Sequence, residues 1–313
     1  MSPTPFTVWL EDALSGWILP VAALAALALV GGLYLGGFVG EEAVATLTVV
    51  VVGIGAALYL GRAALDASRD RLGRGLALAG ALVTAVAVLL PGLRTVRPGE
   101  PLFAGDLGQI DDRIPVPAGV DGAVRLLVSG KLADRGEPSV SFTISGTREP
   151  VEGRLERTFS TARVGRSGRA RVAHDHTADY YPAALPPGAQ ALRLERVQGD
   201  LGSRLRVEVF REPIPLAGGP WILAAVALVL ACAAEARLGM KNDVSVWTGM
   251  ALAFGLLVTY NATPAAAVGP AVGGVILGAI TGSIIGWLGS ILARKLVSPP
   301  QRRPARPNGA AAA

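Results

Sequence analysis

Few residues of this chain have both the type and the spacing that chemistry needs, and they lie together in its middle. His174 and His176 are its only histidines, and two positions apart on a strand they would share a face. Asp179 follows and could add an oxygen ligand, so the three side chains could hold a zinc- or copper-like ion. The alternative is a polar rim at a strand end, since Ala170 and Val172 share that face. We favour the rim, and expect no resident cofactor and no enzymatic activity.

The rest of the chain offers little for catalysis. It contains no nucleophile elbow, P-loop, dinucleotide fingerprint or metalloprotease helix. The single cysteine, Cys232, excludes an intrachain disulfide and a metal cluster built on cysteine. Basic residues concentrate in one stretch, at Arg154, Arg157, Arg163, Arg166, Arg169 and Arg171. Because Glu149, Glu152 and Glu156 are interleaved with them, we interpret this stretch as a solvated face and expect no nucleic-acid partner.

Composition indicates that much of the chain lies in a lipid bilayer. Only 17% of its residues are charged and 51% are hydrophobic, whereas soluble domains average about 25% charged residues. The first apolar run, 17–39, is long enough to cross about 30 Å of hydrocarbon as a helix. Five more runs follow, at 43–60, 75–93, 221–234, 244–260 and 268–292. The sequence therefore predicts a membrane α-helical bundle of six transmembrane helices, three in 17–93 and three in 218–296.

The two ends of the chain differ from these runs. In residues 1–16, Phe6 and Trp9 recur at helical spacing while Glu11 and Asp12 fall on the other side, which predicts either an interfacial helix or the start of the first span. A cleaved signal peptide is disfavoured, because no Lys or Arg precedes the first apolar run. The tail at 297–313 is rich in Pro and Arg and is expected to be disordered.

The positions of Lys and Arg in the connections predict the orientation of the helices. Basic residues gather in three places, at Arg62, Arg69, Arg71 and Arg74, at Arg237 and Lys241, and after the last helix at Arg294 and Lys295. The connections 40–42 and 261–267 carry none. We therefore expect a multi-pass protein of a bacterial cytoplasmic membrane, with both termini cytoplasmic and residues 94–217 outside.

The polar block between the two groups of helices has the alternation of β-strands. Apolar residues alternate with Ser and Thr over 138–146 and with charged residues over 205–209. Weaker strand signals cover 123–132, 154–164, 169–176 and 189–197, with Gly, Pro and Asp clusters between them. A loop is expected at 177–187. The block therefore predicts an inserted all-β sandwich, jelly-roll or Ig-like, over 94–217.

The end of this block resembles part of a known family. The segment 185–210 contains a proline- and glycine-bearing turn, an LRL strand, a Gly/Asp loop and a final strand. In that order it resembles the closing strands of jelly-roll carbohydrate-binding modules, although other antiparallel sandwiches can give the same pattern. A glycan is thus one expected ligand of the outer domain, and a partner protein of the cell envelope is the other. We expect a non-enzymatic envelope protein that binds one of the two.

The last apolar run carries a stripe of small residues. Gly274, Gly278, Gly282 and Gly286 recur every fourth residue, a spacing that lets helices approach closely. The stripe predicts a helix-packing surface, either within this chain or in a homo-oligomer or larger membrane complex. The second possibility leaves a channel or transport-complex subunit as the alternative function. An ion-coupled carrier is disfavoured, because the spans hold almost no ionisable residues and Glu235 falls near a helix end.

Overall fold

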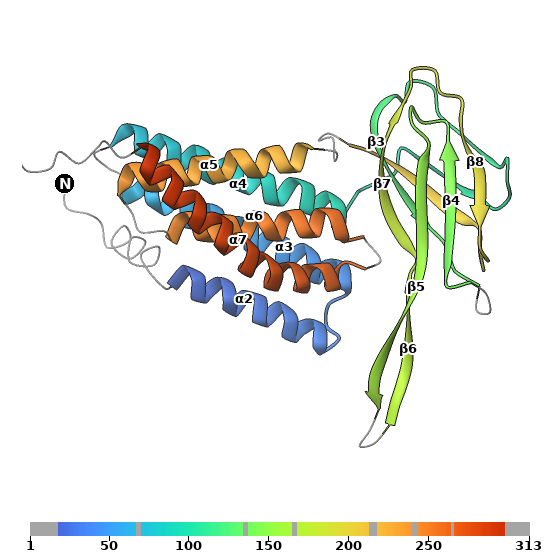
Figure 1. Cartoon of the computed structure of the whole chain (residues 1–313), viewed down its shortest axis with the longest axis horizontal. Coiled ribbons are helices and arrows are strands. Elements are labelled where there is room, and N and C mark those ends of the chain that lie inside the picture. The colour runs from blue at the N-terminus through green and yellow to red at the C-terminus, as the bar shows by residue number, and fades with distance from the viewer. Residues whose placement is uncertain are drawn as a thin grey trace, which may run out of the picture.

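The structure is a computed structural model that describes residues 18–66, 70–133, 137–164, 168–212, 218–239, 243–263 and 266–297, with only the backbone described for 18–20, 158–164, 168–176 and 297. The predicted segment 1–16 and the tail after residue 297 lie outside these ranges, as do Arg69 and Lys241. Within them the chain forms six helices and nine strands, and all the strands lie between the third and fourth of these helices. Figure 1 shows the helices side by side, with the strands gathered at one end.

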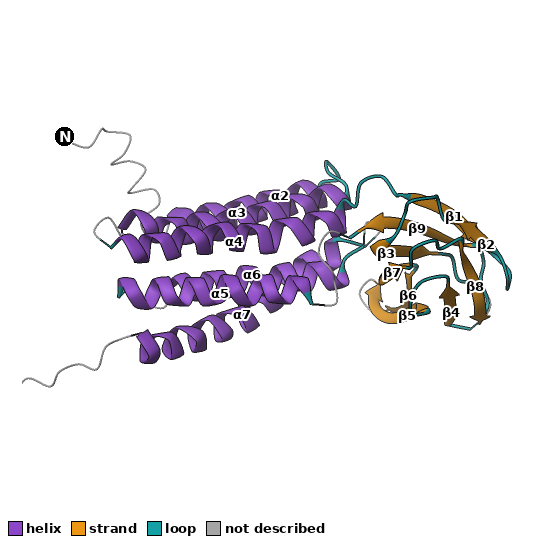
Figure 2. Ribbon diagram, turned by 90° about the horizontal axis from the view of Figure 1, so that it is seen from above, coloured by secondary structure: helices purple, strands orange, loops and turns teal. Residues whose placement is uncertain are grey.

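The helices fall into two groups of three along the chain. The first group is α2 (Ile18–Leu35), α3 (Glu41–Asp66) and α4 (Arg71–Val96), and the second is α5 (Gly219–Leu238), α6 (Asp243–Asn261) and α7 (Val268–Val297). By length and composition, the five helices α3 to α7 can each cross a membrane, while α2 is a shorter apolar helix. The first group lies over the second in Figure 2. The prediction of apolar helices on both sides of an inserted β-region is confirmed.

The strands form two antiparallel sheets. One has the order β1 (Phe103–Leu107), β9 (Leu205–Arg211), β3 (Gly122–Ser129) and β7 (Ala178–Leu185). The other has the order β2 (Arg113–Pro115), β8 (Ala191–Gln198), β4 (Ser139–Ser145), β5 (Val151–Val164) and β6 (Gly168–His176). We call the two sheets together the β-domain. The ends of β5 and β6 extend past the other strands as a two-stranded ribbon (Figure 1).

The core of the β-domain comes from the apolar half of each alternating strand. Val140, Phe142 and Ile144 of β4 are buried in one cluster with Leu126 of β3 and Val207 of β9, which lie in the other sheet. The Ser and Thr residues between the β4 members are only half-buried and face outward. Alternation therefore identified the inward face of these strands correctly.

The predicted loop at 177–187 is wrong, because β7 fills most of it. Strand β7 lies at the edge of its sheet and pairs with β3 along its whole length. Pro182 sits in the middle of β7, and proline is tolerated on an edge strand, where its missing N–H breaks no ladder. The short strands β1 and β2 were also not predicted.

The β-domain contacts the helices through the buried side chain of Arg125 on β3, and we call this contact the junction. This side chain is 2% exposed, and its guanidinium donates to the Thr95 hydroxyl at 3.1 Å and to the Arg94 carbonyl at 2.8 Å. Its Nε lies 3.3 Å from a carboxylate oxygen of Glu212, and its Cζ lies 4.3 Å from the ring centroid of Tyr180. Since Thr95 belongs to the last turn of α4, one buried arginine joins the sheet to a helix of the bundle.

Candidate functional site

The outer face of the second sheet carries a trough along β4. Ser139, Ser141 and Thr143 point outward from β4 and are small, so they form a low floor. The neighbouring strands carry long side chains in the same rows, which stand up as walls on both sides. Ser141 is flanked by Arg154 and Gln198, and Thr143 is flanked by Glu152 and Arg196.

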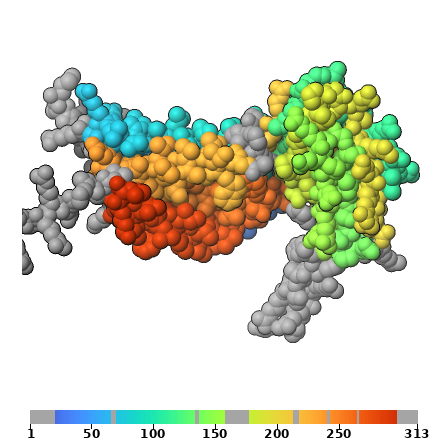
Figure 3. Space-filling view, turned by 45° about the horizontal axis from the view of Figure 1, so that its top comes forward, coloured from blue at the N-terminus to red at the C-terminus, as the bar shows by residue number. Residues whose placement is uncertain are grey.

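The trough is hollow over both of these rows. One hollow of about 470 Å³ is lined by both rows and by Tyr181, and a second of about 550 Å³ continues from Ser141 toward Ser139. Ser141, Arg154 and Gln198 line both hollows. In Figure 3 the β-domain stands as a lobe beyond the ends of the helices. The trough is thus a continuous groove on the domain, and more of its surface is polar than apolar.

Charge in the trough is balanced and accessible. Arg154 pairs with Glu156 at 2.9 Å and donates to the Ser139 hydroxyl at 3.1 Å, and both members of the ion pair are largely exposed. Exposed pairs of this kind contribute little to stability, about 0–1 kcal/mol. A ligand can therefore take over these hydrogen bonds without a large loss of protein stability.

Tyr181 closes one side of the groove in a fixed position. Its ring meets Phe142 edge-on, with centroids 5.5 Å apart, and its hydroxyl accepts a hydrogen bond from the backbone N–H of Arg154 at 3.1 Å. Gly153 makes room for this contact, since a Cβ there would lie 2.2 Å from the Phe142 ring. Burial raises the pKa of Tyr181 to about 12, so its hydroxyl stays protonated near neutral pH.

The three predicted metal ligands are divided between the two sheets. His174 and His176 lie on β6, opposite Thr158 and Glu156 of β5, whereas Asp179 lies on β7 and pairs with Val128. The side chains of both histidines lie outside the described residues, so the metal site stays a prediction. Asp179 therefore lies on a separate strand, and not in the loop that the sequence predicted after the histidines.

The glycine stripe of α7 lies against α6 of the same chain. A Cβ on Gly282 would lie 2.2 Å from the Gly249 carbonyl oxygen, and one on Gly286 would lie 2.3 Å from that of Ser245. At Gly278 the nearest atom is the Phe254 backbone nitrogen at 2.8 Å, and at Gly274 it is the Phe254 ring at 3.2 Å. Gly249 faces the stripe from α6 and needs the same room. The two backbones are in direct contact along this line.

Replacing Gly282 with alanine should therefore lower the stability of the bundle by about 1–3 kcal/mol, because the added methyl group must force α6 and α7 apart. Gly273→Ala is the matched control, since nothing lies within 4 Å of a Cβ there. It should be neutral or slightly stabilising, by up to about 1 kcal/mol. Reversible unfolding of both variants in mixed detergent micelles measures the difference. Equal stability of the two variants would contradict the close contact.

A buried carboxylate lies where α5, α6 and α7 meet. Glu235 is fully buried and accepts hydrogen bonds from the backbone N–H of Ser245 at 2.9 Å and from the Ser290 hydroxyl. Its partner Arg294 donates to it at 3.0 Å and is 39% exposed. Glu235 does lie near a helix end, as the sequence indicated, but its burial was not foreseen. One carboxylate therefore ties together three helices at the end of the bundle away from the β-domain.

No family model, no curated protein and no solved structure matches this chain. The structure itself shows three separate sites that are each assembled from distant parts of the chain: the two polar rows of the trough, the contacts of Arg125 with α4, and the Glu235 cluster. None of these three was singled out by the sequence analysis. The signal for the trough was nevertheless present, because small residues alternate on one strand while charged and amide residues alternate on the two strands beside it.

Proposed function

We propose that this chain is a multi-pass protein of a bacterial cytoplasmic membrane with six spanning helices, three before and three after the β-domain. Both termini would be cytoplasmic, and residues 94–217 would lie outside. Basic residues at the helix ends away from the β-domain support this orientation, among them Arg62, Arg71, Arg74, Arg237 and Arg294. The end near the β-domain carries Glu41 and Glu42 at the start of α3.

We further propose that the β-domain binds a glycan of the cell envelope in the trough along β4. The observation that carries this proposal is the floor of serine and threonine hydroxyls between walls of arginine, glutamate and glutamine. Such side chains offer several donors and acceptors at close spacing, which suits a ligand covered with hydroxyl groups. Tyr181 adds a rigid aromatic edge to one wall. A segment of a partner protein is the competing ligand.

Co-sedimentation of the full-length chain in detergent with purified peptidoglycan sacculi tests this proposal. We expect the unaltered protein to bind sacculi, and Arg154→Ala to lower its affinity for them about tenfold, since a hydrogen bond to a charged group contributes about 1.5–3 kcal/mol. Ser141→Trp should abolish it by filling the floor. The control is Arg206→Ala on β9, a strand of the other sheet. It removes an exposed arginine that pairs at 2.8 Å with Glu208 of the same strand.

The two ligand classes give different results in this experiment. Binding to sacculi that Ser141→Trp removes and Arg206→Ala leaves intact supports a glycan in the trough. Binding that all variants share would place the glycan elsewhere on the protein. If the unaltered protein does not bind sacculi but binds an envelope protein, and Ser141→Trp abolishes that binding, then the ligand of the trough is a protein and not a glycan.

A further inference from the structure

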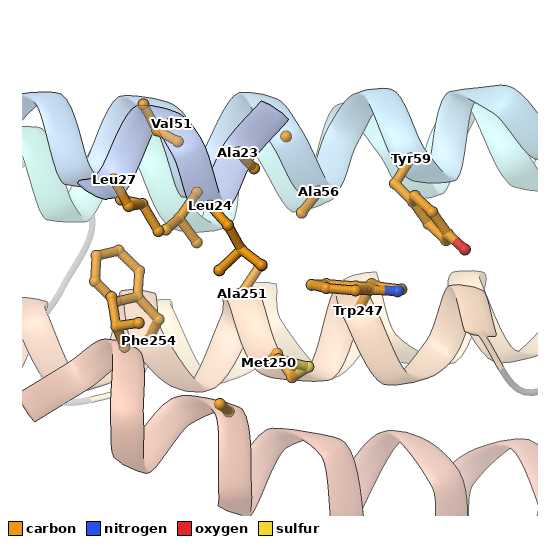
Figure 4. Close-up of a pocket in the computed structure, with 14 residues that line it drawn as sticks. Ala23, Leu24, Leu27, Val51, Ala56, Tyr59, Trp247, Met250, Ala251 and Phe254 are labelled. Atoms are coloured by element: carbon orange, nitrogen blue, oxygen red, sulfur yellow. The ribbon is translucent and has the colours of Figure 1, made fainter. Parts of the chain in front are cut away.

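A separate hollow lies inside the helix bundle, far from the trough. It is a cavity of about 320 Å³ between α2, α3, α6 and α7, and almost all of its lining is apolar. Small residues, among them Gly55 and Ala56 of α3 and Ala251 of α6, leave the space (Figure 4). The volume is within the usual range for ligand sites, about 300–1,000 Å³.

One end of this cavity differs chemically from the rest. Tyr59 and Trp247 lie there, with ring centroids 5.8 Å apart. In Figure 4 the Tyr59 oxygen and the Trp247 nitrogen both point away from the apolar end, where Phe254 and Leu27 lie. The guanidinium carbon of Arg62, one turn further along α3, lies 5.8 Å from the Tyr59 ring centroid. The cavity therefore has an apolar body, an amphipathic aromatic end and a cation just beyond it.

The polar end faces the side of the bundle where basic residues gather. Tyr59 lies near the end of α3 and Trp247 near the start of α6, and both helix ends are remote from the β-domain. Tyrosine and tryptophan favour the boundary between hydrocarbon and water, and basic residues there attract acidic headgroups. An apolar body with this kind of end matches an amphiphile better than it matches a wholly apolar molecule.

We propose that this cavity binds one alkyl chain of an acidic phospholipid, with the lipid headgroup beside Arg62. The alkyl chain of the lipid lies between α2 and the α6–α7 pair, against Ala56 and Ala251. The phosphate of its headgroup lies past the Tyr59 and Trp247 rings. The bound lipid fills space that the side chains leave open, so it fixes the position of α2 on the bundle. This site is independent of the ligand of the trough.

Fluorescence quenching at Trp247 tests the proposal directly. The full-length chain is reconstituted in nanodiscs that contain dibrominated phosphatidylglycerol, and the signal of Trp247 is obtained by subtracting the spectrum of Trp247→Phe. We expect strong quenching of Trp247 that remains when the surrounding lipid is exchanged for unbrominated lipid. Native mass spectrometry should find one phosphatidylglycerol retained in preference to phosphatidylcholine, and Arg62→Gln should remove that preference.

Cavity-filling variants separate a bound lipid from the general lipid shell. Ala56→Leu should reduce the retained lipid about tenfold or more, because its side chain occupies the place of several methylene groups. The matched control is Ala79→Leu on the exposed surface of α4, which should leave retention unchanged. If Ala56→Leu does not fold, Ala251→Val makes a smaller change to the wall that α6 contributes to the same cavity. Equal lipid retention in the filled and control variants, or equal retention of both lipids by the unaltered chain, would overturn the assignment.

Discussion

Replacing Arg125 with methionine should lower the free energy of opening of the β-domain by about 3–5 kcal/mol, the largest effect we expect from a single substitution. Methionine keeps much of the volume but removes the charge that faces Glu212, whose side chain is only 7% exposed. It also removes the two hydrogen bonds to the last turn of α4 and the contact with the Tyr180 ring. Hydrogen exchange of the β3 and β7 amides in the full-length chain measures the loss.

Two further variants make the source of this effect clear. Arg193→Met removes an exposed arginine that pairs with Asp111, and it should cost less than about 1 kcal/mol. Adding Glu212→Gln to Arg125→Met should recover part of the stability, because the buried carboxylate that has lost the Arg125 charge is then replaced by a neutral amide. An Arg125→Met protein that exchanges at the rate of the unaltered chain would show that the junction does not hold the domain.

The second large effect should come from Arg294→Gln, which leaves the fully buried Glu235 without its cation. A broken buried pair costs about 3–5 kcal/mol. Because Arg294 is partly exposed and solvent screens it, we expect a smaller loss of about 2–3 kcal/mol here. Reversible unfolding in mixed detergent micelles measures the stability of the bundle.

The charge on Glu235 is the part of this cluster that needs compensation. Glu235→Gln in the Arg294→Gln background should therefore regain stability, since the carbonyl of a neutral amide at position 235 can still accept from the Ser245 N–H while its NH2 group donates to the Ser290 hydroxyl oxygen. Arg237→Gln is the control at the same end of the bundle, where the arginine pairs with Asp70 at the surface. It should change the unfolding midpoint little. If the double variant is less stable than Arg294→Gln alone, the charge is not the cause.

The helices and the strongest strands could be predicted from the sequence because their signals are local. An apolar run of sufficient length identifies a spanning helix by itself, and the alternation in β4 and β9 identifies the inward face of a strand. Strand β7 was missed because Pro182 and the small residues beside it hide the alternation. Strand β1 was missed for a related reason, since Gly105 is required where the Ile114 side chain approaches to within 2.8 Å of a Cβ.

The candidate sites could not be predicted because their parts are distant in the sequence. Glu235 and Arg294 are 59 positions apart in the sequence. Arg125 contacts the last turn of α4, a helix that ends at Val96, 29 positions before it. The cavity of Figure 4 depends on four helices whose relative positions no local pattern states. The glycine stripe was visible, but its partner Gly249 was not, because a single glycine on α6 has no repeat.

The pairing of β1 with β9 has a consequence for how this architecture can change. The chain enters the β-domain at β1 and leaves it at β9, and these strands lie side by side, with Phe103 opposite Val209. The helices before and after them, α4 and α5, also pack against each other. The β-domain is therefore a cassette whose two ends meet, so a short loop could take its place between α4 and α5. The helical part could acquire, exchange or lose the β-domain without any change in the order of its helices.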